Sequence, residues 1–158
     1  MKRTFDYKIG VISDTHCLVR KSVINAFNDV DLIVHAGDIE KPDALETLKT
    51  IATVHSVRGN VDGGKWVKNL PYTKVVQVGQ VYLYVLHDLN TLDLDPAAAG
   101  FNVVIYGHSH IPKIEERSGV LFLNPGSAGP RRFDYPISIA FLYIKGTSIE
   151  TEMVELKG

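Results

Sequence analysis

Three short apolar runs alternate with two amphipathic segments in the N-terminal part of the chain. The runs cover residues 8–13, 31–36 and 53–57, and each has the length of a buried strand. Between them, residues 22–27 and 42–49 place apolar side chains on one face of a helix. Strands separated by helices in this way pair in parallel, and the helices cover the sheet. This pattern therefore predicts an α/β fold.

The second half of the chain favours antiparallel pairing. Residues 73–78 and 81–87 alternate around Gly79-Gln80, which is typical of a hairpin. Asp95 and Pro96 are typical of the cap and first turn of a short alanine-rich helix, which Gly100 would end. We expect one domain over residues 1–158, with a mixed sheet or two packed sheets and helices outside. Further strands are expected at residues 102–106, 120–123, 137–144 and 148–156.

Composition excludes several classes of function. The 158 residues include 17 Lys and Arg against 18 Asp and Glu. Proteins that bind long nucleic acid or a membrane surface normally carry a basic excess, so neither partner is expected. The longest unbroken apolar stretch, residues 139–144, is too short to span a membrane, and the N-terminus lacks a signal-peptide core. The single cysteine, Cys17, fits a reducing compartment, so a cytoplasmic location is expected.

Polar side chains that can bind a metal follow five of the expected strands. In open α/β sheets, functional sites form beyond the carboxyl ends of the strands, where neighbouring loops converge. Carboxylate, amide and imidazole ligands without a thiolate suit Mn²⁺, Fe, Zn²⁺ or Co²⁺ better than Ca²⁺ or a structural zinc. The candidate metal ligands are Asp14, His16, Asp38, Asn60, His87, His108 and His110.

The spacing of these residues supports a shared site. The Asp-x-His pair at residues 14–16 and the His-x-His pair at residues 108–110 each place two ligands two residues apart. In an extended segment such side chains point the same way. A glycine precedes Asp38, Asn60 and His108, and it allows a sharp turn of the backbone. Each of these short motifs alone is typical of a cap or a turn, but the five motifs in this order predict a metal site.

This order of motifs resembles the calcineurin-like metallophosphoesterases. The run Asn-Pro-Gly-Ser at residues 124–127 resembles the small bacterial and archaeal phosphodiesterase branch of that family. The resemblance covers residues 8–142. It implies a four-layer α-β-β-α sandwich, in which two mixed β-sheets are flanked by helices, with a site for two metals.

The resemblance also implies the cofactors and the reaction. The cofactors would be two divalent ions, Mn²⁺ first, with Zn²⁺, Fe, Co²⁺ or Ni²⁺ as alternatives. The activity would be that of a metal-dependent phosphoesterase, a phosphodiesterase first, in which a hydroxide bridging both metals attacks a small phosphodiester. In the implied division of ligands, Asp14, His16 and His110 hold one metal, Asn60, His87 and His108 hold the other, and Asp38 bridges them.

Two positions depart from the family pattern. Val61 stands where many family members carry a histidine that protonates the leaving oxygen, so efficient hydrolysis of alkyl monoesters is not expected. Asp88 stands where glycine is frequent, and it is either a turn residue, the reading we favour, or a group that donates a proton or orients His87. Asp62, which follows Val61 in the sequence, either supports a metal ligand or has a structural role.

Two histidines lie outside the candidate ligand set. His35 lies inside an apolar run and His55 alternates with valines, so both are expected in the core or behind the ligands rather than on a metal.

The family also contains a retromer subunit that serves as a protein-binding scaffold and has a degraded metal site. The complete ligand set of this chain favours an enzyme over such a scaffold. Exposed apolar residues in the last strands would allow a homodimer.

Overall fold

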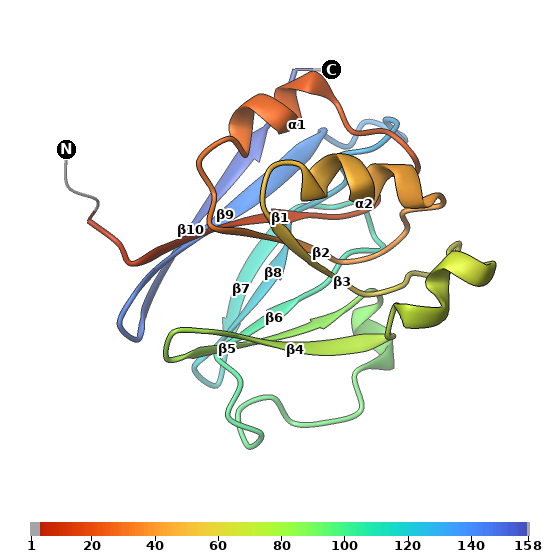
Figure 1. Cartoon of the computed structure of the whole chain (residues 1–158). Helices are drawn as coiled ribbons and strands as arrows, with labels where there is room; N and C mark the ends of the chain where they lie inside the picture. The colour runs from red at the N-terminus through yellow and green to blue at the C-terminus, as the bar shows by residue number, and fades with distance from the viewer. Residues whose placement is uncertain (1–3, 158) are drawn as a thin grey trace.

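Two five-stranded β-sheets pack against each other in the computed structural model, which describes residues 4–157 (Figure 1). Sheet A has the order β10-β9-β1-β2-β3, and sheet B has the order β4-β5-β6-β8-β7. The strands of sheet A are β1 (Tyr7–Ile12), β2 (Leu32–His35), β3 (Thr53–Ser56), β9 (Ser138–Lys145) and β10 (Ser148–Glu155). Those of sheet B are β4 (Thr73–Val78), β5 (Val81–Leu86), β6 (Val103–Ile105), β7 (Lys113–Arg117) and β8 (Val120–Asn124).

Both sheets are mixed, as predicted. In sheet A, β1 pairs in parallel with β2 and β2 with β3, whereas β9 runs antiparallel to β1 and to β10. In sheet B, β5, β6 and β8 are parallel, and β4 and β7 are antiparallel edge strands. Five of these six parallel strands, β1, β2 and β3 in sheet A and β5 and β6 in sheet B, are followed in the chain by the expected metal ligands.

The main core lies between the two sheets. Ile9 and Val11 of β1 contribute to one buried cluster with Val85 of β5 and Ile105 of β6, and all four are at most 1% exposed. The intervening Gly10 points to the other face of sheet A. Since both sheets bury this face, neither can shift without exposing apolar surface, at roughly 25 cal/mol per Å².

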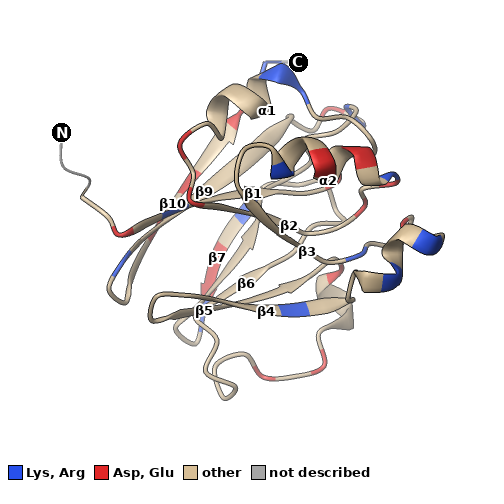
Figure 2. Cartoon of the chain, in the orientation of Figure 1, with Lys and Arg blue, Asp and Glu red and all other residues tan. Residues whose placement is uncertain are grey.

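Helices cover the outer face of sheet A (Figure 1). They are α1 (Lys21–Ala26) and α2 (Pro42–Lys49), close to their predicted bounds. Val23 of α1 and Leu48 of α2 pack in one cluster with Ile33 of β2. The acidic residues of α2 lie toward its start and its basic residue at its end (Figure 2), with Asp43 in the first turn and Lys49 in the last. This order suits the helix dipole.

The outer face of sheet B is covered by irregular chain. The predicted helix at Asp95–Gly100 is wrong: these residues form turns, and a 3₁₀ turn, η2 (Leu89–Thr91), precedes them. Asp95 Oδ1 does accept hydrogen bonds from the N–H groups of Ala97 and Ala98, as a helix cap does. However, the alanines are exposed, and so short a helix with no face to bury is marginal. Leu92, Leu94 and Phe101 cover the sheet instead.

Besides η2, two elements of the structure were not predicted. The strand β7 is a charged edge strand, whose sequence Lys-Ile-Glu-Glu-Arg lacks apolar alternation, and it forms because β8 pairs with it. Charge on an edge strand also discourages pairing with another chain. The 3₁₀ helix η1 (Lys65–Asn69) follows the loop after β3. No helix within residues 4–157 is long and apolar enough to cross a membrane.

Gly10 allows α1 to lie close to sheet A, and its replacement tests this packing. A Cβ at this position would lie 2.8 Å from Cε1 of Phe27, which is fully buried. We expect Gly10→Ala to destabilise the protein by about 1–3 kcal/mol through overpacking, although alanine normally suits a strand better than glycine. Urea unfolding measures this loss.

The matched control is Gly63→Ala, because a Cβ at Gly63 meets no atom within 4 Å. Its effect on the free energy of unfolding is expected to stay within about 0.5 kcal/mol. Equal effects of the two substitutions would contradict the packing argument.

Candidate metal centre

Backbone hydrogen bonds continue the pairing of β1 and β2 into the loops that follow them. The N–H of Asp14 donates to the carbonyl of Gly37 at 3.0 Å, and that of His16 donates to the carbonyl of Asp38 at 3.1 Å. The N–H of Cys17 likewise donates to the carbonyl of Ile39 at 2.9 Å. The Asp-x-His and Gly-Asp motifs therefore lie side by side because they extend a parallel ladder.

The structure brings the seven predicted ligands together where strands of both sheets end. Two groups can each hold a metal ion, with one ligand atom per residue and all those atoms within 4.8 Å of one another. The first group is Asp14, His16 and His110, and the second is Asp38, His87 and His108. The seventh residue, Asn60, contacts the second group. The first group matches the one that the family resemblance implies. For the second metal, the resemblance implies Asn60 with His87 and His108, and it makes Asp38 the bridge.

Asp14 and His16 are each held by one atom and leave another free. Asp14 Oδ2 accepts hydrogen bonds from Ser13 Oγ at 2.7 Å and from the N–H of His108 at 3.2 Å. His16 Nδ1 lies 2.7 Å from Glu40 Oε1. The remaining atoms, Asp14 Oδ1 and His16 Nε2, are buried without a hydrogen-bond partner. Buried polar atoms are rarely left unpaired, so these two atoms fit a bound cation.

His87 and Asp38 form a close pair in the second group. His87 Nδ1 lies 2.8 Å from the carbonyl of Ala36, which directs Nε2 toward Asp38 Oδ2 at 3.1 Å. Burial alone would raise the pKa of Asp38, but the hydrogen bond and charge of His87, with the N–H of Val61, lower it to about 2. Burial alone would lower the pKa of His87, but its bond to Asp38 and the charge of Asp14 raise it. Asp38 is thus held as a carboxylate.

Asp38 also lies between the two groups. Its Oδ2 is 3.9 Å from His16 Nε2 in the first group as well as 3.1 Å from His87 Nε2 in the second. Its Oδ1 accepts a hydrogen bond from the N–H of Val61 at 3.1 Å, which fixes the carboxylate. A carboxylate in this place can contact ligands of both groups, as the resemblance implies for a bridging residue.

The side-chain amide of Asn60 completes the second group. Its Oδ1 lies 3.2 Å from His108 Nδ1, and the same position is 3.0 Å from His87 Nε2 and 3.2 Å from Asp38 Oδ2. All of these neighbours can offer lone pairs. An amide oxygen among them suits a shared cation, whereas rotation of the amide would place its NH₂ there as a hydrogen-bond donor. The donor set therefore fits a divalent ion.

The backbone is strained at the predicted ligands. Five of the seven have a positive φ, between 44° and 72°: Asp14, His16, Asp38, His108 and His110. This conformation costs roughly 1–3 kcal/mol for a residue other than glycine, and such residues cluster at functional sites. Gly107 allows the last loop to approach, because a Cβ there would lie 2.7 Å from Asp14 Oδ2.

Asp62 fixes the loops from behind. Its Oδ1 accepts hydrogen bonds from the N–H groups of Ile39 and Glu40, and its Oδ2 accepts from those of Asp38 and Gly59. All four bonds are between 2.8 and 3.0 Å. Asp62 thus joins the Gly-Asp loop to the Gly-Asn loop, and hydrogen bonds to a charged acceptor contribute roughly 1.5–3 kcal/mol each. Its role is to position ligands.

Three further residues support the site and were missed as participants. Glu40 contacts His16, and its pKa is lowered by the hydrogen bond from that ring. Asn124 Nδ2 donates to the carbonyl of Gly107, and Ser127 Oγ donates to the carbonyl of Asp14. The run at residues 124–127 was noted only as a family resemblance. A signal for Glu40 was its place two residues after Asp38, in the Asp-x-Glu spacing.

The two departures from the family pattern have defined surroundings. The side chain of Val61 is 43% exposed and offers no proton donor. Asp88 Oδ1 accepts a hydrogen bond from the N–H of Asn90 and caps η2, which confirms its turn role. Its Oδ2 lies 4.0 Å from His108 Nε2, so the same side chain also faces the site.

The two other histidines lie off the metal groups. His35 is fully buried and satisfied: its Nδ1 accepts from the N–H of Gly37 and its Nε2 lies 3.0 Å from Thr15 Oγ1. Burial lowers the pKa of His35 to about 4. His55 is partly buried, and its Nδ1 has no hydrogen-bond partner. Among the described residues, neither histidine belongs to the two groups that could hold a metal ion.

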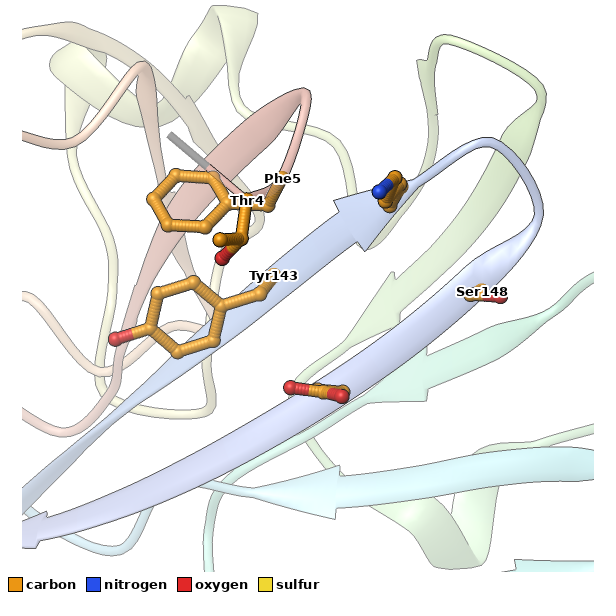
Figure 3. A pocket seen from close by; sticks show the side chains of 6 residues that line it. Thr4, Phe5, Tyr143 and Ser148 are labelled. Carbon is orange, nitrogen blue, oxygen red and sulfur yellow. The ribbon is translucent and has the colours of Figure 1, made fainter. Parts of the chain in front are cut away.

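Cavity size alone does not identify the site. A cavity of about 490 Å³ lies against Phe5 and Tyr143, on β9 and β10 (Figure 3). Tyr143 pairs with Lys8 at the amino end of β1, so this cavity lies away from the metal ligands at the carboxyl end. A smaller cavity, of about 220 Å³, adjoins the ligands Asn60 and His87.

Comparisons with known proteins agree with this geometry. The family model described as the calcineurin-like phosphoesterase superfamily domain matches residues 7–147. A probable metallophosphoesterase from Methanothermobacter thermautotrophicus is 36% identical over 158 residues, covering 92% of this chain and 91% of the relative. A phosphodiesterase from Methanocaldococcus jannaschii is 30% identical over 138 residues, covering 75% of this chain and 82% of the relative.

A solved structure shows the same fold. Vacuolar protein sorting 29 from Cryptosporidium parvum superposes with a TM-score of 0.78, covering 98% of this chain and all of that one. The two sequences are 20% identical, so the likeness is one of fold alone.

The neutral state of His35 makes stability depend on pH. Its folded-state pKa is about 4, against an ordinary 6.5, so between these values the unfolded chain binds a proton that the folded protein does not. Stability is therefore lost as the pH falls from 7 to 4, by about 3 kcal/mol at about 1.4 kcal/mol per pKa unit. Urea unfolding of metal-free protein at each pH measures this loss.

The control for this effect is His35→Asn, whose side-chain oxygen can still accept from the N–H of Gly37. Other groups titrate equally in both proteins, so the wild type should lose about 3 kcal/mol more than the variant over this range. Equal losses in the two proteins would show that His35 is not the source.

Proposed function

The chain belongs to the calcineurin-like phosphoesterase superfamily, and from this we propose that it is a phosphodiesterase with two divalent metal ions. Its relatives and its candidate ligand groups together support a metal-dependent phosphoesterase; the diester preference and the paired ions are the proposal. One observation gives this proposal its main support. Asp14 Oδ1 and His16 Nε2 are buried without a hydrogen-bond partner, and they converge with the other predicted ligands.

The proposed ligand assignment follows the two groups. Asp14, His16 and His110 would hold one ion, and Asn60, His87 and His108 would hold the other, with Asp38 between them. When bound, such ions polarise phosphoryl oxygens and lower the pKa of a water to near neutrality. We favour Mn²⁺, with Zn²⁺, Fe, Co²⁺ or Ni²⁺ as alternatives, since affinity orders are similar among proteins and supply decides.

Neighbouring residues of the chain would hold the ligand side chains in a fixed orientation. Glu40 and Ala36 hold His16 and His87 by their Nδ1 atoms, so both rings present Nε2 to the site. Asp62 keeps the loop of Asp38 in place. Hydrogen bonds of this kind preorganise a site, so no rearrangement is needed when the substrate binds.

The surroundings of Val61 support a diester with a good leaving group. General acid catalysis contributes roughly 10²–10⁴-fold where it operates, and Val61 cannot supply it. Alkyl monoesters, which need protonation of the leaving oxygen, are therefore poor candidates. The phosphodiesterase from M. jannaschii, 30% identical, also supports a diester substrate. The near-neutral charge of the chain favours a small substrate over long nucleic acid.

The rival function is a protein-binding scaffold. The likeness to vacuolar protein sorting 29 is one of fold, and it does not by itself favour this role. The complete set of metal-ligating side chains favours the enzyme. Metal-stripped protein can be assayed against phosphomonoesters and phosphodiesters after each of the five ions is added back singly. No activity with any ion would favour the scaffold.

Replacement of predicted ligands tests the proposed activity. We expect Asp38→Ala and His108→Ala each to reduce hydrolysis of bis(4-nitrophenyl) phosphate by Mn²⁺-loaded protein at least about 100-fold, because each removes a ligand. Circular dichroism should remain unchanged. The rate is followed by release of 4-nitrophenolate.

The matched control is Asp93→Ala, an exposed acidic residue outside both groups. It should keep the wild-type rate. Unchanged turnover in the Asp38 and His108 variants would refute the proposed assignment.

Glu40 offers a second test, which does not depend on activity. Because Glu40 Oε1 orients His16, we expect Glu40→Gln to weaken Mn²⁺ binding by about 10-fold and Glu40→Ala by up to about 100-fold. Isothermal titration calorimetry measures both constants. Glu46→Gln, on the exposed side of α2, is the control and should bind Mn²⁺ like the wild type.

Full metal affinity in Glu40→Ala would show that Glu40 does not position His16.

A further inference from the structure

We propose that the cavity beside Asn60 and His87 binds a planar aromatic group of the substrate, and that Tyr72 is the residue that recognises it. The inference rests on the proposed function, because it places the aromatic group next to a phosphoryl group held at the metal centre. It makes the substrate class a phosphodiester that carries an aryl group or a nucleobase.

The position of the cavity supports this role. It has a volume of about 220 Å³ and a mainly apolar wall. Two proposed ligands, Asn60 and His87, form one side, and Arg58 and Tyr72 contribute to the rest. A group bound here is therefore in direct reach of a phosphoryl group at the second set of ligands.

Tyr72 has the properties of a stacking platform. Its side chain is 68% exposed, although the Arg58 guanidinium carbon lies 4.5 Å from the ring centroid. An aromatic ring with one covered face and much exposed surface can stack a second planar group. Tyr72 also immediately precedes β4, so its backbone is anchored to sheet B.

Arg58 is itself fixed, which holds the ring in place. Its Nε donates to the carbonyl of Leu70 at 2.7 Å, and its Nη2 donates to the carbonyl of Val67 at 3.0 Å. Its backbone N–H donates to the carbonyl of Pro71, next to Tyr72, at 2.9 Å. The platform is therefore preorganised, and binding needs little ordering of side chains.

The size of the cavity limits what fits. Pockets for drug-sized ligands commonly have roughly 300–1,000 Å³, so about 220 Å³ suits one ring system rather than a whole dinucleotide. An alkyl group would also enter, but it gains less from the face of an aromatic ring. The ring system of an aryl or nucleobase substituent is thus the occupant that Tyr72 favours.

Two phosphonates, one with a phenyl and one with a methyl substituent, provide the direct test. Binding of phenylphosphonate and of methylphosphonate to Mn²⁺-loaded protein is measured by isothermal titration calorimetry. We expect the wild type to bind phenylphosphonate at least roughly tenfold more tightly, a factor typical of a stacked aromatic group. In Tyr72→Ala this preference should fall to about twofold or less, while the affinity for methylphosphonate stays unchanged.

Two further variants separate stacking from other effects. Tyr72→Phe keeps the ring and should keep the preference. Tyr82→Ala removes another exposed tyrosine, on β5 and outside the cavity, and should also keep it. The same comparison with adenosine 5′-monophosphate and ribose 5-phosphate distinguishes a nucleobase from a simple aryl group.

The outcomes separate this inference from the proposed function. If the wild type binds both phosphonates equally, or if Tyr72→Ala retains the preference, the inference is wrong while the phosphodiesterase can stand. A loss of preference in Tyr72→Phe would also overturn stacking. If metal-loaded protein binds neither phosphonate and hydrolyses no diester, the proposed function fails and the inference fails with it.

Discussion

The parallel pairing of β1 and β2 is the constraint on which the functional end of the molecule depends. Three hydrogen bonds extend that ladder beyond both strands and place Asp14 and His16 beside Asp38. The backbone can follow this path only with left-handed conformations at the ligands. That strain is tolerated because the two sheets bury a shared apolar core and leave the strand ends no room to move.

Four of the predicted ligands, Asp14, His16, Asp38 and His87, are each held by one atom so that another faces the site. A carbonyl, a carboxylate or a backbone N–H occupies the outer atom, and the inner atom faces the site. Asp62 extends this arrangement, since it belongs to neither metal group yet fixes two of the loops. In a poorly solvated place such fixed dipoles act strongly, which is why this set of side chains suits a cation and an anionic substrate.

The accuracy of sequence-based prediction varied with the strength of the local pattern. The apolar runs that end in polar residues predicted the bounds of β1, β2 and β3 to within a residue or two. The helix expected at Asp95–Gly100 failed because its alanines have no face to bury, although its cap formed. The edge strand β7 has no apolar alternation and depends on β8 for its existence. The cluster of the seven candidate ligands followed from the strand ends, but Glu40 was missed because its partner is 24 residues away.

The sequence by itself determined the types of ligand, their order along the chain, the parallel half of the fold and the lack of a proton donor at Val61. These properties are local, because they depend on residue type and on spacing within one segment. Tertiary structure alone decided which atom each ligand presents, how Asp62 joins two loops and where Tyr72 lies. Those features depend on contacts such as that of Asp14 with His108, 94 residues apart, which exist only once both sheets have packed.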